Sequence, residues 1–531
     1  MILRTLCLLA LLAPPLLAAP TVTALLPAGG QRGKTVEITA SGTFPRWPVD
    51  VWVEGTGVSA QAGKEKGKLT LTIAADAVPG PRWLRLVDSE GASSPRRIVI
   101  GTLPELLEQE PNDDRTQPQI LPGPATVVHG KLARSGDVDC FAVKGRKGQT
   151  LVASMDAQRW LGSPMDGVLQ IVSETGFVLA QNNDHHGQDP QVVLPLEADG
   201  TYIVRVFGFP AVADATIGFA GGERFQYRLT ITTGPFIDHA WPVAVERSKL
   251  TPVELVGWNL PGAVGRQAVV PFGDEGRVFL PEAGGLGLVA LEAHGCAIRS
   301  GETLVAVPST TTARLAGPNE SHPYRFQGKK GQRYLFQVES PSRGFVVDPT
   351  LRLTDAAGKL LGQARAGELY RDVELLATIP ADGAYLLTVG DETRHGGPRH
   401  VYLLRARLVE PDFALQVKAD QFSVAPGKTL DVPITVERKH GFAGPIDLTI
   451  EGLPQGVRAQ AVPGMGATQT LRLTADEKAK GGGPIRIVGK AGARSVLARA
   501  TLTDPEATTS ELWLTLSGAP LPAPPTKKKK R

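Results

Sequence analysis

The stretch that decides the fold begins with Glu108-Gln-Glu-Pro-Asn-Asp-Asp114 and ends with Gln226-Tyr-Arg-Leu-Thr-Ile231. Between these ends lie Gly136-Asp-Val-Asp-Cys-Phe141 and Ala198-Asp-Gly-Thr-Tyr202. Polar and apolar residues alternate around such turn-like clusters, as in Tyr202-Ile-Val-Arg-Val206. An alternation of period two, interrupted by Gly, Pro, Asn and Asp, is typical of half-buried strands. The sequence therefore predicts a β-sandwich here.

The order of these motifs resembles the bacterial pre-peptidase C-terminal domain. The resemblance includes Gly130-Lys-Leu132 and Lys147-Gly-Gln149 and extends from Glu108 to Ile231. It implies a small, jelly-roll-like β-sandwich that is not catalytic, tolerates calcium and usually accompanies secreted peptidases. No peptidase motif occurs in these 531 residues, so the resemblance indicates a kind of domain more clearly than a function.

Part of this stretch recurs later in the chain. Lys147-Gly-Gln149 returns as Lys330-Gly-Gln332, and Ala198-Asp-Gly-Thr-Tyr202 returns as Ala381-Asp-Gly-Ala-Tyr385, both 183 residues further on. Because order and spacing are both retained, we predict a duplicated domain. In each copy the Asp-Gly pair is expected to form a turn that leads into a strand.

The segments that precede the two copies are also alike. Gly33 to Gly42 and Pro252 to Leu260 resemble the Ig-like modules called IPT or TIG, and Phe413 to Val457 resembles Ig-like domains of bacterial exported proteins. We therefore predict an all-β protein built of tandem β-sandwiches. Its predicted parts are a signal peptide (1–19), an IPT/TIG-like domain (20–101), a first pre-peptidase-like sandwich (105–233), a second IPT/TIG-like module (234–300), a second pre-peptidase-like sandwich (301–410), an Ig-like domain (411–503) and a Pro/Ala-rich tail with a basic end (504–531).

The composition is that of ordinary globular protein. Among the 531 residues are 60 Gly and 43 Pro, an excess that fits many turns between short strands. A net charge of +4 is too small to argue for nucleic acid as a partner. Outside the N-terminal apolar run the chain has two cysteines, Cys140 and Cys296, which is too few for a disulfide scaffold.

The N-terminus is typical of an export signal. Arg4 precedes an apolar run from Leu6 to Leu17, and the small residues Ala18-Ala19 follow. The run is shorter than the roughly 20 residues that span a bilayer, and no later segment is long and apolar enough. We expect a periplasmic, cell-surface or extracellular protein. The basic run Lys527–Arg531 either binds anionic polymers or is a hydrated, frayed end.

The strongest candidate site is for calcium, which takes about six to eight oxygen ligands. An acidic segment precedes the first pre-peptidase-like strands, and an acidic pair precedes Cys140, where residues two apart on an extended strand point to the same side. The resemblance implies the same site, since pre-peptidase-type collagen-binding domains of bacterial collagenases bind calcium with such a segment and an Asp pair. The alternative is a solvated acidic linker without an ion. The candidate ligands are Glu108, Glu110, Asn112, Asp113, Asp137 and Asp139.

The second copy lacks this pattern. The shift of 183 residues places Glu320 and His322 opposite the Asp137–Asp139 pair, and no acidic segment precedes them. Too few hard oxygen ligands remain, so we expect no calcium in the second copy.

A second cluster, Asn182 to Asp189, contains His185 and His186. Histidine with neighbouring aspartate offers ligands for Zn²⁺ or Cu²⁺. Adjacent residues on a strand point to opposite faces, however, and the Asn, Asp and Gly around the pair favour a solvated turn.

Enzyme signatures are absent from the sequence: we find no Gly-x-Ser-x-Gly elbow, no His-Glu-x-x-His, no phosphate loop and no Cys/His metal knuckle. We therefore expect an exported, non-catalytic binding or adhesion protein, whose partner is an extracellular protein or polysaccharide. The alternatives are an accessory subunit of a separately encoded secreted peptidase, a structural component of the envelope, and a hydrolase whose residues converge from loops.

Overall fold

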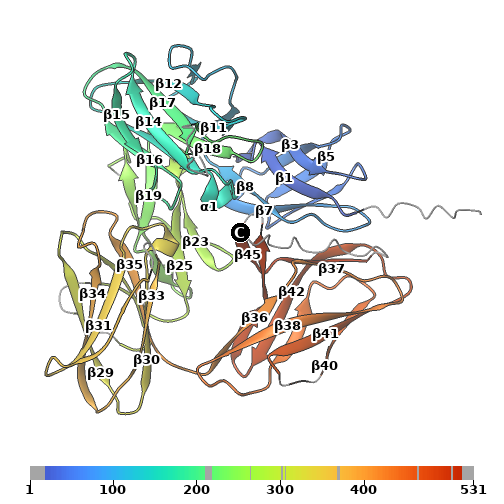
Figure 1. The fold of residues 1–531 in the computed structure, drawn as a ribbon, viewed down its shortest axis with the longest axis vertical. Coiled ribbons are helices and arrows are strands. Elements are labelled where there is room, and N and C mark those ends of the chain that lie inside the picture. Colours follow the sequence, from blue (N-terminus) through green and yellow to red (C-terminus); the bar gives the residue numbers. More distant parts are fainter. Residues whose placement is uncertain are drawn as a thin grey trace, which may run out of the picture.

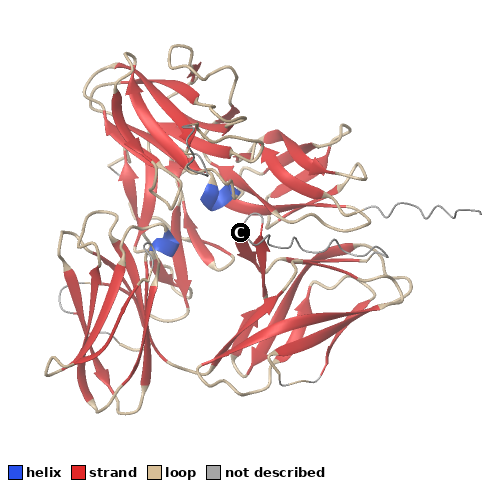
Figure 2. Cartoon of the chain, in the orientation of Figure 1, coloured by secondary structure: helices blue, strands red, loops and turns tan. Residues whose placement is uncertain are grey.

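The computed structural model describes residues 18–209, 218–262, 265–299, 303–304, 306–367, 371–462, 464, 466–503 and 506–516. In this part of the chain nearly all regular structure is β-strand, and ten sheets pair into five sandwiches, called modules 1 to 5 in chain order (Figures 1 and 2). The predicted fold class, all-β with tandem sandwiches, is confirmed. Residues 1–17 of the predicted signal peptide and the basic run Lys527–Arg531 lie outside the described residues.

Module 1 packs two four-stranded sheets, in the orders β1-β3-β6-β5 and β2-β8-β7-β4. Alternation builds its core: in β6 the apolar residues Leu69, Leu71 and Ile73 are buried, and the residues between them are partly or fully exposed. The strands are β1 (Thr21–Leu26), β2 (Gly29–Gln31), β3 (Thr35–Thr43), β4 (Asp50–Val53), β5 (Val58–Ala62), β6 (Lys68–Ile73), β7 (Gly80–Val87) and β8 (Arg96–Gly101).

Module 2 packs sheets of order β10-β12-β17-β14-β15 and β16-β13-β18-β11-β9. One turn of helix, α1, interrupts the connection between β13 and β14. The elements are β9 (Glu105–Leu107), β10 (Gln119–Ile120), β11 (Ala125–Lys131), β12 (Asp139–Gly145), β13 (Thr150–Asp156), α1 (Gln158–Leu161), β14 (Gly167–Ser173), β15 (Val178–Asn182), β16 (Gln191–Pro195), β17 (Gly200–Gly208) and β18 (Gln226–Thr232).

Module 3 is the smallest sandwich, with sheets of order β21-β19-β24 and β20-β25-β23-β22. It lies at the centre of the molecule, between modules 2 and 4 (Figure 1). Its strands are β19 (Phe236–Trp241), β20 (Ala244–Glu246), β21 (Glu254–Trp258), β22 (Val270–Phe272), β23 (Glu275–Val278), β24 (Gly284–Gly285) and β25 (Gly287–Glu292).

Module 4 repeats module 2 strand by strand, with sheets of order β27-β29-β34-β31-β32 and β33-β30-β35-β28-β26. The repeated turns also have the same role: Asp199 accepts the Lys147 N–H at 2.7 Å, and Asp382 accepts the Lys330 N–H at 2.6 Å. The elements are β26 (Cys296–Ile298), β27 (Thr303–Leu304), β28 (Ser309–Arg314), β29 (Ser321–Gly328), β30 (Arg333–Glu339), the 3-10 helix η1 (Pro341–Arg343), β31 (Pro349–Asp355), β32 (Leu360–Arg365), β33 (Val373–Thr378), β34 (Gly383–Asp391) and β35 (Val401–Leu408).

Module 5 extends beyond residue 503, so the predicted start of the tail at 504 is too early. The strand β46 pairs with β37 and β42, and burial of Leu512, Trp513 and Leu514 completes the sandwich. The strands are β36 (Asp412–Val417), β37 (Gln421–Ser423), β38 (Thr429–Lys439), β39 (Asp447–Glu451), β40 (Val457–Val462), β41 (Thr468–Ala475), β42 (Gly482–Ala491), β43 (Arg494–Leu497), β44 (Arg499–Thr503), β45 (Glu506–Thr509) and β46 (Leu512–Thr515).

The chain folds back so that module 5 lies against module 1 (Figure 1). Arg85 of β7, only 1% exposed, donates to the Asp420 carboxylate at 2.6 Å and to the Glu511 carbonyl at 2.9 Å. Trp52 packs edge-on against Trp513 with 6.0 Å between the ring centroids. A buried charge is stable only when it is paired, so the Arg85–Asp420 contact fixes where the last module docks.

Candidate metal site and inter-module junction

The six predicted calcium ligands lie together in module 2. Four come from the loop after β9, and two come from the loop before β12 and the first residue of that strand. The Cys140 N–H donates to the Asn112 carbonyl at 3.0 Å, which holds the acidic loop against β12. As a result Asn112, Asp137 and Asp139 are at most 1% exposed. The structure therefore brings together the residues that sequence spacing singled out, and it buries half of them.

Tyr227 of β18 joins two of these carboxylates, although its place in an alternating run predicts only core packing. Its hydroxyl lies 2.5 Å from an oxygen of Asp139 and 3.0 Å from an oxygen of Glu108. A hydroxyl has one proton to donate, so it serves one carboxylate at a time. The other carboxylate must then hold a proton itself or share a cation.

The buried oxygens of the cluster outnumber the donors around them. Asp137 accepts the Ala133 N–H with one oxygen, while its other oxygen is buried and has no hydrogen-bond partner. One terminal atom of the Asn112 amide lies 3.0 Å from Glu110 and 3.2 Å from Asp139. With nitrogen in that place the amide donates to both carboxylates, and with oxygen there it faces a cation together with them.

Positive charge in the cluster is confined to its exposed side. Glu110, Asp113 and Asp137 bring carboxylate oxygens within 4.8 Å of one another, and Arg134 pairs with Asp113 at 2.8 Å on the exposed side. Burial, followed by repulsion from Glu108, raises the pKa of Asp139, and burial likewise raises the pKa of Glu108. A buried set of hard oxygens with surplus negative charge fits the ligand requirement of Ca²⁺.

The same place in module 4 holds a hydrogen-bond network with a single carboxylate instead. His322 takes the position of Asp139, and its Nδ1 lies 2.7 Å from the Tyr402 hydroxyl, which lies 2.6 Å from the Tyr324 hydroxyl. Its Nε2 lies 2.8 Å from Glu320, the one carboxylate of this network. Burial lowers the pKa of His322, so that its imidazole is neutral near pH 7. Each polar group has a partner without an ion.

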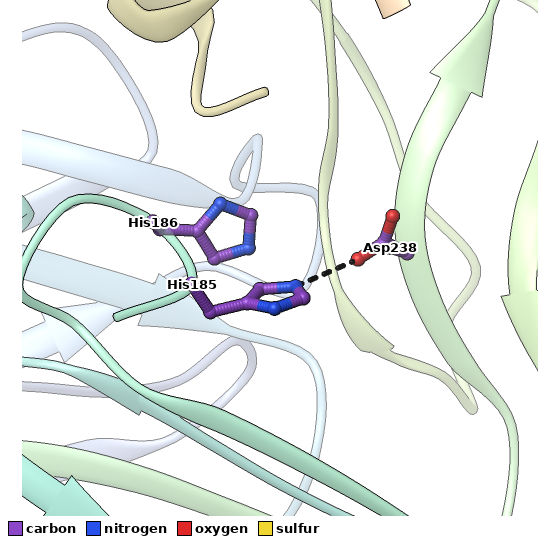
Figure 3. A group of neighbouring side chains, drawn as sticks. All are labelled: His185, His186 and Asp238. Atoms are coloured by element: carbon purple, nitrogen blue, oxygen red, sulfur yellow. Dashed lines mark ion pairs between the residues drawn. The ribbon is translucent and has the colours of Figure 1, made fainter. Parts of the chain in front are cut away.

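The predicted turn is present and exposes Asn183, Asp184, Gly187 and Gln188, but its two histidines are half-buried against other modules. His185 Nε2 lies 3.5 Å from Asp238 of module 3 (Figure 3), and His186 Nδ1 lies 3.2 Å from the Gly344 carbonyl of module 4. The turn is anchored by Asp189, which is fully buried and accepts the N–H groups of α1. The sequence does not reveal this environment because the partners belong to other modules.

The side chains of this turn and Asp238 have the spacing of metal ligands, but the cationic side chain of Arg399 is paired with them. His185, His186 and Asp238 bring ligand atoms within 4.8 Å of one another. The Arg399 guanidinium, however, pairs with Asp238 and lies 3.3 Å from His186 Nδ1. Although burial favours the neutral acid, hydrogen bonds from His185 and His239 and the charge of Arg399 hold the pKa of Asp238 well below its usual range. The cluster is therefore an ion-paired junction of modules 2, 3 and 4.

In the part of the chain that the structure describes, no helix is long and apolar enough to cross a membrane. No known protein family profile matches the chain. Over 118 residues it is 34% identical to a probable subtilase-type serine protease of Deinococcus radiodurans, a match that covers 21% of this chain and 16% of that protein. The chain thus corresponds to about a sixth of the length of this relative.

Two solved structures illustrate the kinds of protein to which the chain is similar. The pre-peptidase C-terminal domain of a Bacillus anthracis collagenase is 16% identical, with 20% of this chain and 98% of that domain covered and a TM-score of 0.17. An Escherichia coli adhesin is 9% identical, with 96% of this chain and 100% of the other covered and a TM-score of 0.16. The sandwich fold is established by the sheets described above.

Proposed function

We propose that this chain is an exported, non-catalytic binding protein of the cell envelope or extracellular space, and that module 2 carries a structural calcium ion. The observation that supports the ion is the buried oxygen cluster, with one hydroxyl proton between Glu108 and Asp139 and an unpartnered oxygen on Asp137. Glu108, Glu110, Asn112, Asp113, Asp137 and Asp139 would hold the ion. Calcium would supply the positive charge that the buried side of the cluster lacks.

The place of the ion suggests its role. The acidic loop follows β9, which connects module 1 to module 2, and Glu105 of β9 pairs with Arg228 at 2.7 Å and with His129 at 2.6 Å. An ion bound just after this anchored strand would fix the acidic loop against β12. The relative orientation of modules 1 and 2 would then depend on calcium, as expected for a scaffold that presents loops to a partner.

The proposed partner is an extracellular protein or polysaccharide. The resemblance of modules 2 and 4 to pre-peptidase C-terminal domains, and of modules 1 and 3 to IPT/TIG modules, supports a binding role. To test it, the protein is exposed to an extracellular fraction of its native cells in calcium or in a chelator, with the Asp137→Ala/Asp139→Ala variant as control. A partner retained by wild type in calcium alone supports the proposal. Turnover of a peptide, ester or glycoside that one point mutation abolishes would contradict the absence of catalysis.

A second candidate is an accessory subunit of a secreted peptidase. The 34% identity to part of a probable subtilase-type serine protease favours it, because the shared portion is one that such a protease carries. Recovery of a separately encoded hydrolase in the same pull-down would support this candidate. Recovery of envelope polysaccharide or a non-enzymatic protein in its place would exclude it.

A further inference from the structure

A cavity of about 400 Å³ lies where modules 1, 2, 3 and 4 meet, apart from the acidic cluster. Module 1 contributes Arg97, module 2 contributes α1, module 3 contributes Asp238 and His239, and module 4 contributes η1. This volume is in the range of pockets that bind small molecules, which are about 300–1,000 Å³. We call it the junction cavity.

The duplicated sandwiches line the junction cavity with equivalent elements. The helix α1 follows β13, η1 follows the corresponding strand β30, and the two helices are blue in Figure 2. Each ends at a glycine in the left-handed conformation, Gly162 and Gly344. Each also brings an arginine to the cavity wall, Arg159 from α1 and Arg343 from η1. The repeat thus places one cationic side chain from each copy on the same cavity.

Positive charge exceeds negative charge on this wall. Four arginines line it, against the carboxylates Asp238 and Glu275. Arg159 is paired with Asp156 at 3.0 Å and Arg343 with Glu339 at 2.6 Å, while Arg399 is paired with Asp238. The fourth arginine, Arg97, forms no such direct ion pair among the described residues.

Arg97 is half-buried, and the two carboxylates that act on its charge, Glu54 and Glu275, form no ion pair with it within 4 Å among the described residues. It donates to the Arg159 carbonyl at 3.1 Å, and its guanidinium lies 4.4 Å from the ring centroid of Trp83. Neither contact neutralises the charge. Because charged groups taken out of water are normally paired at short range, the space beside Arg97 suits an anion.

Other groups on the wall indicate that the anion is organic and hydroxylated. His239, whose side chain is 6% exposed, bonds Asp238 through Nδ1 at 2.7 Å, and its Nε2 is buried without a partner. With the proton on Nδ1, where Asp238 accepts it, Nε2 is an acceptor and suits a hydroxyl donor. Trp160, Phe345 and Leu288 add apolar surface, which an inorganic ion would not use.

We propose that the junction cavity binds a ring-sized hydroxy-carboxylic acid, such as a sugar acid. Its carboxylate would lie against Arg97 and Arg343, and a hydroxyl would donate to His239. Since four modules line the cavity, the ligand would also stabilise their arrangement by binding only the assembled form. This proposal is independent of the calcium site and goes beyond the proposed function.

Isothermal titration calorimetry of the full chain, with D-galacturonate and D-glucuronate as probes, tests the proposal. We expect one uronate per chain and no measurable heat with D-galactose, which has the same ring without the acid. Arg97→Gln and Arg343→Gln should each weaken uronate binding by about tenfold or more, because each removes a charge-assisted hydrogen bond. Arg472→Gln, which removes the same charge from an exposed ion pair with Asp431 in module 5, should leave binding unchanged.

The other outcomes are equally decisive once circular dichroism shows that each variant is folded. The proposal is refuted if neither uronate binds, if Arg97→Gln and Arg472→Gln behave alike, or if inorganic phosphate binds as tightly as uronate. Trigalacturonate distinguishes a free sugar acid from the end of an acidic polysaccharide as the natural ligand. Tighter binding than the monomer identifies the end of an acidic polysaccharide as the ligand, and equal or weaker binding identifies the free sugar acid.

Discussion

Calcium binding to module 2 is expected to release about one proton near neutral pH. Without the ion, the Tyr227 hydroxyl lies between Asp139 and Glu108 and has a single proton for the two carboxylates. One of the two acids therefore retains a proton, and burial raises the pKa of both. Because calcium coordinates the ionised carboxylates, binding must displace this proton.

The size of the effect follows from that proton count. Release of one proton makes binding about tenfold tighter for each pH unit, or about 1.4 kcal/mol, until the raised pKa of the pair is passed. Without calcium, the free energy of unfolding changes with pH in the opposite direction to the calcium affinity. The folded state binds more protons than the unfolded state, so the free energy of unfolding should fall as pH rises from the ordinary carboxylate pKa of about 4 toward the raised one.

Calorimetric titration of calcium in buffers of different ionisation enthalpy measures the protons released. The wild-type chain should release about one proton between about pH 7 and about 9, the raised pKa values of Glu108 and Asp139, and its affinity should rise across that range. Asp139→Asn removes one of the two acids, so the proton release should disappear and binding should weaken. Glu320→Gln alters the corresponding place in module 4 and should retain the wild-type slope. Calcium affinity that does not vary with pH, with no proton released, would refute the reasoning.

Three further predictions concern the junctions and the turns. Asp420→Asn leaves Arg85 buried without its counter-charge and should weaken the docking of module 5 by about 3 kcal/mol, which X-ray scattering would detect as an expanded particle. The control Asp431→Asn, which breaks an exposed ion pair, should leave the particle size unchanged. Burial, and then the charges of neighbouring arginines, hold the pKa of His186 well below its usual value, so the free energy of unfolding should decrease as pH falls below about 6.5, by up to about 1.4 kcal/mol per pH unit. In thermal unfolding at about pH 5 to 7, His186→Gln should reduce this dependence on pH. Asp199→Ala removes the acceptor of a turn N–H and should lower the free energy of unfolding by about 1 kcal/mol in denaturant titration, with no change in calcium affinity.

Local sequence patterns were sufficient for the fold class and for the two acidic segments, and the resemblance to pre-peptidase-type domains implied that the six residues form one group. Alternation marks which face of each strand is buried, and the acidic residues lie in two short segments that the sandwich brings together. The role of Tyr227 was not predictable, since it depends on a strand 88 residues away from Asp139. The environment of His185 was missed for a similar reason, because its partner Asp238 lies in another module.

The two copies show how a repeat predicts a fold without predicting a site. Offset counting correctly aligned His322 with Asp139, and both face a tyrosine of the corresponding strand. The tyrosine pair that completes the hydrogen-bond network in module 4 could not be read from the alignment, because Tyr324 and Tyr402 meet across the sandwich. With one carboxylate replaced by an imidazole and a second hydroxyl added, the module 4 network satisfies its polar groups without the ion proposed for module 2.

The most direct test of the account is the number of calcium ions bound per full-length chain, measured by equilibrium dialysis with thermal unfolding of the same samples. We predict one ion for the wild-type chain and for Glu320→Gln, and none for Asp137→Ala/Asp139→Ala. At a free calcium concentration of 100 times Kd the bound ion should add about 2.7 kcal/mol to the free energy of unfolding of module 2. No bound ion in the wild-type chain, or an ion that persists in the double variant, would contradict the account.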